Sequence, residues 1–345
     1  MTGHRRGFAS DNRAGPHPEV LAAVAAVAGG HAASYGGDDV TAALGAAVRR
    51  EFGPHAEAFP MFNGTGANVV ALAALTRGRA AVICTDVAHV HTDEGGAPEA
   101  LAGLKLWTVP TPDGRLTPAL VETQAWGFDD VHRAKPAVVT ITQSTEMGTV
   151  YAPAEIAALA AQAHGHGMKL HLDGARLANA AAALGVSLAE VTSAAGVDAV
   201  TFGATKNGAL AAEAVIVFDP ETADAVRRLR KTHGQLPSKM RFVSAQILAL
   251  LTDGLWRRCA AHANAMASRL AAAVRGLPGV TITQPVEANA VFVILPPQAS
   301  ARLQARHGFF TWNQATREVR WMCAWDTTPE DVDEFVADVA RELGR

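Results

Sequence analysis

Short apolar strands alternate with helical segments through the middle of the chain, and this alternation most restricts how the chain can fold. Strands are predicted at residues 56–61, 80–84, 104–109, 137–141, 168–172, 199–202 and 214–218. Helical segments are predicted after several of them, at about residues 64–75, 118–124 and 154–164 and from residue 175 onward. Parallel neighbouring strands need a crossover connection, usually a helix, so this order predicts an α/β fold with a mostly parallel sheet.

The pattern changes beyond about residue 250. Strands are predicted at residues 280–283, 290–295 and 318–324, with helices near residues 299–305 and 329–343. A chain of 345 residues is also long for a single hydrophobic core. We therefore expect a large α/β domain at residues 16–250, a smaller α+β domain at residues 251–345, and an N-terminal segment of residues 1–15 that contributes to the active site.

Composition excludes several classes of protein. The net charge of −3 gives no electrostatic argument for binding to nucleic acid or to an anionic membrane. No window approaches 18 uninterrupted apolar residues, and no apolar stretch follows the basic N-terminus, so we predict a cytoplasmic protein. The three cysteines, Cys84, Cys259 and Cys323, are widely spaced among apolar residues, which indicates buried thiols rather than disulfides or a metal site.

Two charged residues stand at the ends of predicted strands. Asp173 follows the strand at residues 168–172, and Lys206 follows the strand at residues 199–202 among small residues. Ligands of open α/β sheets bind at the carboxyl ends of the strands. An aspartate that holds a pyridinium nitrogen and a lysine that forms a Schiff base are the protein groups that pyridoxal phosphate (PLP) most requires. The pair therefore predicts a PLP site.

A third feature is the turn at residues 63–68, with the sequence Asn-Gly-Thr-Gly-Ala-Asn, between a strand and a helix. Free backbone N–H groups and the positive end of a helix dipole suit a phosphate group. The turn lacks a Walker lysine and the three-glycine spacing of a dinucleotide site. From these residues alone, a phosphate cradle and a plain helix start are equally favoured.

With these features in place, the chain resembles the PLP-dependent threonine aldolases, which have the aspartate-aminotransferase fold (fold type I). The resemblance extends from Ser10 to Arg320. It is carried by four segments: His171-Leu-Asp-Gly-Ala-Arg-Leu-Ala-Asn179, Asn63-Gly-Thr-Gly-Ala-Asn68, Tyr35-Gly-Gly-Asp-Asp39 and residues 89–96, from His89 to Glu94-Gly-Gly96.

The resemblance implies a role for each matching residue. Lys206 would carry the cofactor, Asp173 would hold the pyridine nitrogen, and His89 would lie over the ring. The residues implied for the phosphate are Gly64 and Thr65, with Arg241 reaching it across a subunit interface. The residues implied for the substrate are Ser10, Arg176 and Arg320 at the α-carboxylate, with Arg176 also beside the cofactor, His132 near the β-hydroxyl, and Tyr35 from a neighbouring subunit.

The implied activity is cleavage of a β-hydroxy-α-amino acid to glycine and an aldehyde. Two departures from the family pattern, Thr205-Lys206-Asn207 and residues 143–146 (Gln-Ser-Thr-Glu), bear on substrate preference. The base remains open among His89, His132 and a water, and His91 competes with His89. The alternatives are β-elimination of an amino acid and a catalytically silent protein. We expect a homodimer or homotetramer with shared active sites and no metal.

Overall fold

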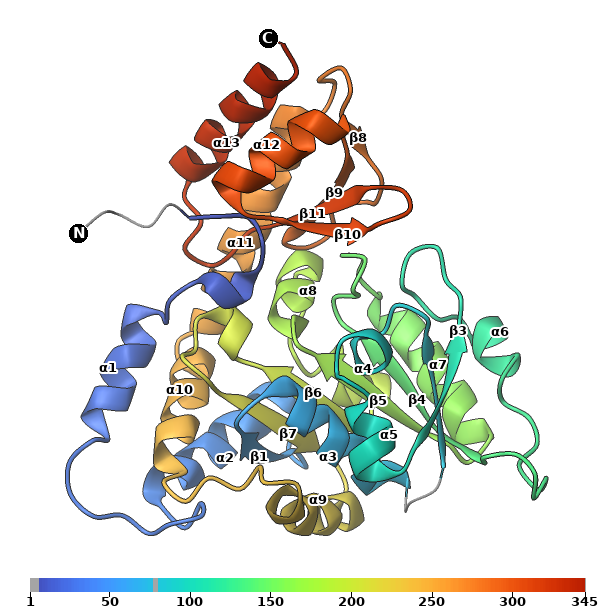
Figure 1. The fold of residues 1–345 in the computed structure, drawn as a ribbon. Helices are drawn as coiled ribbons and strands as arrows, with labels where there is room; N and C mark the ends of the chain where they lie inside the picture. The colour runs from blue at the N-terminus through green and yellow to red at the C-terminus, as the bar shows by residue number, and fades with distance from the viewer. Residues whose placement is uncertain (1–5, 77–79, 345) are drawn as a thin grey trace.

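The computed structural model describes residues 6–76 and 80–344, and a seven-stranded sheet is its largest element (Figure 1). The strands lie in the order β1-β7-β6-β5-β4-β2-β3. Their bounds are β1 Glu57–Met61, β2 Ala81–Thr85, β3 Lys105–Val109, β4 Pro136–Thr142, β5 Lys169–Gly174, β6 Ala199–Gly203 and β7 Glu213–Val217. The pairs from β3 to β6 are parallel, and β7 is antiparallel to both of its neighbours.

Helices cover both faces of this sheet. Their bounds are α1 Pro18–Ala26, α2 Asp39–Phe52, α3 Gly64–Thr76, α4 His89–Thr92, α5 Ala97–Ala102, α6 Pro118–Glu122, α7 Pro153–Gly165, α8 Leu177–Leu184, α9 Pro220–Thr232 and α10 Arg241–Leu251. The strands carry apolar side chains on both faces: Ile83 packs into one buried cluster and Val82 into another. Burial on two faces is why the strands are continuous apolar runs.

A smaller antiparallel sheet forms from the C-terminal part of the chain, in the order β10-β11-β9-β8. Its strands are β8 Thr281–Ile282, β9 Ala290–Ile294, β10 Phe310–Asn313 and β11 Glu318–Met322, and its helices are α11 Leu255–Val274, α12 Pro297–His307 and α13 Pro329–Glu342. Figure 1 shows this unit at one end of the large sheet, with long α11 leading into it.

The N-terminal segment belongs to the same packed region. The Phe8 side chain is buried and stacks on Phe335, with ring centroids 4.5 Å apart. Its backbone is bonded on both sides, because its N–H donates to the His307 carbonyl and its carbonyl accepts from the Met322 N–H. The short 3₁₀ turn Asp11–Arg13 follows and leads toward the large sheet.

The predicted strands and the mostly parallel sheet are confirmed, with boundaries shifted by a few residues. Strand β10 and the short helices α4 and α5 were not predicted, because four to six residues carry too little periodicity, and β10 depends on pairing with β11. The three cysteines are buried and free, as expected. The division of the chain near residue 250 stays a prediction. Among the described residues, no helix is long and apolar enough to cross a membrane.

Candidate active site

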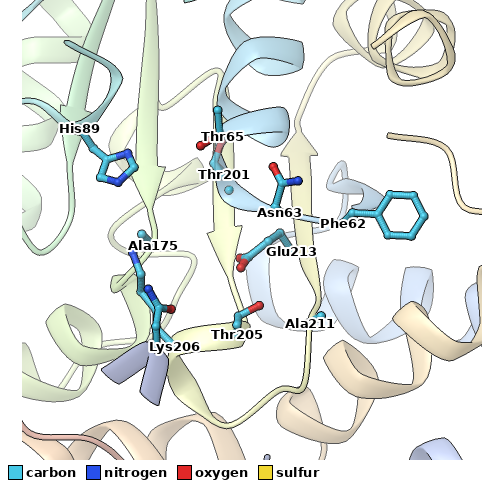
Figure 2. Close-up of a pocket in the computed structure, with 12 residues that line it drawn as sticks. Phe62, Asn63, Thr65, His89, Ala175, Thr201, Thr205, Lys206, Ala211 and Glu213 are labelled. Carbon is cyan, nitrogen blue, oxygen red and sulfur yellow. The ribbon is translucent and has the colours of Figure 1, made fainter. Parts of the chain in front are cut away.

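A cavity of about 270 Å³ lies at the carboxyl ends of β5 and β6, beside the start of β7 and the turn that leads from β1 into α3 (Figure 2). The chain turns into η3 (Thr205–Asn207) after β6 and into α3 after β1, which brings these separate segments together. The cavity is lined by Asn12, Phe62, Asn63, Gly64, Thr65, His89, Ala175, Thr201, Thr205, Lys206, Ala211 and Glu213.

Lys206 lies in the wall of this cavity, on the 3₁₀ turn that follows β6. Burial lowers the pKa of its amine, and the nearby charge of Arg176 lowers it further, while Asp11 and Asp173 oppose the shift. A lowered pKa increases the neutral fraction of the amine, and only the neutral form can attack a carbonyl carbon. The site therefore prepares Lys206 for Schiff-base formation.

Asp173 ends β5 and is buried. One carboxylate oxygen accepts from the Asn68 amide at 2.8 Å, and the other accepts from the Ala175 N–H at 3.0 Å. The Asn68 amide also donates to Glu94 at 2.7 Å, so it bridges the carboxyl groups of Asp173 and Glu94. These bonds fix the orientation of the Asp173 carboxylate, which a partner for a ring nitrogen requires.

His89 is held at two points at the start of α4. Its N–H donates to the Glu146 carboxylate at 2.8 Å, and its Nδ1 lies 2.9 Å from Glu94 Oε1. The hydrogen bond to Glu94 raises the pKa of the imidazole, against the opposing effect of burial. His91, the competing candidate, is exposed on the same short helix. The protonated form of His89 is thus favoured more than in a free histidine.

The turn at the start of α3 forms the other end of the cavity. Asn63 Oδ1 accepts from the Gly66 N–H at 2.8 Å, which leaves Gly64 and Thr65 facing the cavity. A Cβ at Gly66 would lie 2.3 Å from the Gln235 side chain, so this position needs glycine, whereas Gly64 faces open space. Thr65 and Thr201 lie at this end of the cavity, whereas Thr205 lies on the same turn as Lys206 (Figure 2).

Arg176 lies at the N-cap of α8 and pairs with Asp11 of the N-terminal segment. Its Nε and Nη2 atoms donate to the two carboxylate oxygens at 2.7 and 2.9 Å. Asn289 also donates to Asp11, at 3.0 Å. Because Asp11 occupies the Nε–Nη2 edge of the guanidinium, a contact between Arg176 and a substrate carboxylate depends on Nη1 and the second N–H of Nη2.

Arg320 differs from Arg176 in this respect. It lies on β11 with its guanidinium carbon 4.7 Å from the centre of the Trp312 ring, and its buried Nε has no hydrogen-bond partner in the described chain. Burial and the charge of Arg176 lower its pKa to about 10, so it remains cationic at neutral pH. Ser10 directly precedes Asp11, and its hydroxyl oxygen accepts a hydrogen bond from the Asn12 N–H.

The residues that line the cavity do not include Ser10, Asp173, Arg176 or Arg320, although Asp173 and Arg176 lie near enough to Lys206 to shift its pKa. Three further predicted site residues are also absent from the lining. His132 is exposed and precedes β4, which places it at the amino ends of the parallel strands, opposite to Asp173. Tyr35 is half exposed, with Lys231 Nζ 5.4 Å from its ring centre. Arg241 begins α10 and donates to the carbonyls of Val27 and Gly30. A single subunit does not bring these three residues to Lys206, and their roles stay predictions.

The structure also adds residues that the sequence did not assign. Glu94, Asn68 and Asp11 orient predicted residues. Asn68 and Glu94 lie in segments that carry the family resemblance, but the sequence indicated no role for any of the three side chains. Glu213 lines the cavity beside Lys206, and only its place before an apolar strand could have indicated it. Beneath the site, His171 is buried between the hydroxyls of Thr140 and Thr201, and burial lowers its pKa to about 4.

The donor groups fit PLP. Buried atoms without a partner in the described chain include Asn68 Oδ1, Glu94 Oε2, Glu146 Oε2 and Arg320 Nε, which gather around this region. His89, Glu94 and Asp173 could also ligate a metal ion, since their ligand atoms lie within 4.8 Å of one another. A lysine amine and a helix N-terminus in the cavity wall, with an oriented carboxylate close to the lysine, match the aldehyde, phosphate and ring nitrogen of PLP. Fold and site together define a PLP-dependent enzyme.

Comparisons with known proteins agree with this class. Residues 7–297 match the model of the family described as beta-eliminating lyase. A low specificity L-threonine aldolase from Pseudomonas aeruginosa is 45% identical over 345 residues, which cover 100% of both chains. The solved structure of Leishmania major threonine aldolase has 31% identity and a TM-score of 0.92, with 98% of this chain and 100% of that chain covered. Aspartate aminotransferase from Thermus thermophilus, at 18% identity and a TM-score of 0.70, covers 98% of this chain and 90% of its own, and shares the fold.

The chain belongs to the threonine aldolase branch of the beta-eliminating lyase family. Its fold is that of the fold-type-I enzymes, as predicted from the resemblance. It is a PLP-dependent lyase, which confirms the predicted cofactor.

Proposed function

We propose that this enzyme cleaves the Cα–Cβ bond of β-hydroxy-α-amino acids of the L-threonine, L-allo-threonine or phenylserine type, yielding glycine and an aldehyde. The observation that carries the proposal is the cavity lined by Lys206, with the buried Asp173 carboxylate near enough to act on the lysine's charge, in a chain that matches a low specificity L-threonine aldolase over its full length. PLP, when bound, accepts the electron pair released at Cα.

Lys206 and Asp173 bind different parts of the cofactor in this proposal. The Lys206 amine, whose pKa is lowered by burial, would hold the cofactor through its aldehyde. The Asp173 carboxylate keeps the ring nitrogen protonated, because a fixed negative charge favours the pyridinium form. Asn68 holds this carboxylate in place through its 2.8 Å hydrogen bond.

Arg320 binds the substrate α-carboxylate in this proposal. It is a buried cation whose Nε has no partner in the described chain, and an arginine fork matches a carboxylate. Arg176, fixed by Asp11, lies close enough to Arg320 to affect its pKa and adds positive charge. Holding the carboxylate determines which bond at Cα stands perpendicular to the cofactor ring, and hence which bond breaks.

His89, or a water bound to it, removes the proton of the β-hydroxyl. Glu94 orients the imidazole through Nδ1, which leaves Nε2 for the cofactor ring and substrate. His132 stays an alternative base that only another subunit could supply to this cavity. An assembly of at least two subunits with shared sites is therefore part of the proposal, and the cytoplasmic location stays a prediction.

The test is to incubate the PLP-loaded protein with L-threonine, L-allo-threonine, D-threonine and phenylserine, and to measure aldehyde and glycine. We expect both products from the L-substrates in equal amounts. Pyruvate with ammonia in place of glycine would show β-elimination, and no product would show a silent protein.

Lys206→Ala is the control for this assay. The variant should fold and should still bind PLP without a covalent bond, but it should lose turnover. Borohydride should link PLP irreversibly to the wild-type protein and not to the variant, as measured by intact mass. Normal turnover in Lys206→Ala would mean that the lysine is misassigned.

A further inference from the structure

Glu213 is a carboxyl group in the cavity wall that the proposed reaction does not use. It is the first residue of β7, paired with Gly203 at the end of β6 and with Met61 at the end of β1. The first pairing sets it beside the turn that bears Lys206. The second sets it beside the turn that leads into Gly64 and Thr65, so Glu213 faces the end of the cavity where we place the phosphate (Figure 2).

The Glu213 carboxyl is buried and fixed. One of its oxygens accepts from the Ala204 N–H at 3.1 Å, and the residue is 7% exposed. Burial raises its pKa to about 7, while the hydrogen bond from Thr205 and the charge of Lys206 oppose the shift. The carboxyl therefore changes its protonation state near neutral pH.

Few charges face this carboxyl. Lys206 on η3 and His89 on α4 line the same cavity, and Asp173 on β5 adds a negative charge. Apart from Lys206, the cavity-lining residues that β1, α3, β6 and their turns contribute are uncharged: Phe62, Asn63, Gly64, Thr65, Thr201 and Thr205. Within the described part of the chain, the proposed phosphate end thus offers dipoles, hydroxyls and one carboxyl.

A phosphate monoester is largely a dianion above pH 6. Two like charges in one buried site cannot both be ionised without a large cost in free energy. We propose that Glu213 belongs to the phosphate site and holds a proton while PLP is bound, so that its neutral carboxyl donates a hydrogen bond to the phosphate. The inference rests on the proposed position of the phosphate at Gly64 and Thr65.

Cofactor binding is then linked to a proton. Below pH 7 the Glu213 carboxyl already carries the proton, and PLP binds without further uptake. Above pH 7 the carboxylate must take up one proton as PLP binds, so affinity falls as the pH rises. The linkage concerns binding and is independent of aldol cleavage.

The test compares the dissociation constants of PLP for the wild-type apoenzyme and Glu213→Gln at pH 6 and pH 8. Glutamine keeps an oxygen for the Ala204 N–H and cannot ionise. The two proteins should bind PLP equally at pH 6, and the variant should bind about tenfold more tightly at pH 8. Calorimetry in two buffers should show that the wild type takes up about one proton more than the variant at pH 8, since any proton exchanged at Lys206 is common to both.

Two further arms locate the effect. Pyridoxal lacks the phosphate. The ratio of its dissociation constants for the wild type and Glu213→Gln should therefore be the same at pH 6 and at pH 8. The matched control is Glu318→Gln, which changes a buried carboxyl in the smaller unit. Its dissociation constants for PLP and pyridoxal should equal those of the wild type at both pH values. Thr65→Val should weaken binding of PLP and leave pyridoxal unaffected.

Three results would contradict the inference about Glu213, and each has its own meaning. Weaker PLP binding by Glu213→Gln at pH 8 would mean that the carboxylate is ionised and pairs with a cation, which overturns the inference. The same tenfold effect with pyridoxal would assign Glu213 to Lys206 instead. Equal losses of PLP and pyridoxal in Thr65→Val would remove the phosphate position and the inference with it, while the cleavage assay would still decide the proposed reaction.

Discussion

At the scale of the residue, the site depends on groups whose bonds fix their orientation and charge. Asp173 is held by Asn68 and by the Ala175 N–H, so its carboxylate cannot rotate freely. Lys206 lies in a turn of small residues, where burial and the charge of Arg176 lower the pKa of its amine. Substitutions that keep shape and change charge are therefore the informative ones.

Asp173→Asn is the first such substitution. The amide keeps the size of the side chain and removes the charge that favours the pyridinium form, so cleavage should fall by at least about 100-fold. PLP should remain bound. Steady-state rates with L-threonine and the bound PLP content measure the two effects, and a wild-type rate would contradict the role of Asp173.

Glu94→Gln tests the histidine through its pH dependence. The hydrogen bond that His89 donates to Glu94 raises the pKa of the imidazole, and a base acts only in its neutral form. The acid limb of kcat/KM should therefore move to lower pH in the variant. Profiles with phenylserine from pH 5 to pH 9 measure the shift. An unmoved limb would assign the base to another group.

At the scale of the element, the N-terminal segment is joined to α8 by one buried ion pair. Burial acts to raise the pKa of Asp11, but the charge and hydrogen bonds of Arg176 outweigh it and lower the pKa to about 2. Removing one partner of such a pair leaves a buried charge without compensation, at a cost of about 3–5 kcal/mol.

Asp11→Asn should therefore lower the free energy of unfolding at pH 7 by about 3–5 kcal/mol. The folded-state pKa is below the unfolded value, so the stabilisation is present above pH 4 and is lost as the pH falls toward 2. Urea unfolding at pH 7 and at pH 3 should show a smaller difference between the two proteins at the lower pH. An equal difference at both values would contradict the pairing.

At the scale of the whole molecule, one subunit leaves predicted site residues on its surface. Tyr35 is half exposed, and Arg241 contacts the end of α1, outside the cavity that holds Lys206. Closed two-fold oligomers let each subunit give and receive the same group. We expect Arg241 to act on the phosphate of a neighbouring subunit.

Mixing Lys206→Ala with Arg241→Ala tests this expectation, because each variant alone should be inactive. In a hybrid dimer, one site carries both defects and the other carries neither, so random mixing should restore about one quarter of wild-type activity. Native mass spectrometry measures the hybrid fraction. Hybrids without activity would show that Arg241 does not act in the site of the neighbouring subunit.

The sequence by itself determined the large sheet, because each buried strand is a local apolar run and each crossover helix follows it in the chain. It also determined the positions of Lys206 and Asp173, since both directly follow such strands. Family resemblance supplied the residues that no local pattern marks, such as Arg320 on β11.

Tertiary structure alone decided which groups meet. The pairing of Asp11 with Arg176 joins residues 165 positions apart, and the Asn68 amide lies between Glu94 and Asp173 from three different elements. Glu213 reaches the cavity only because β7 runs antiparallel between β1 and β6. Such contacts depend on sheet order and on packing across long loops, and a local sequence pattern carries no information about either.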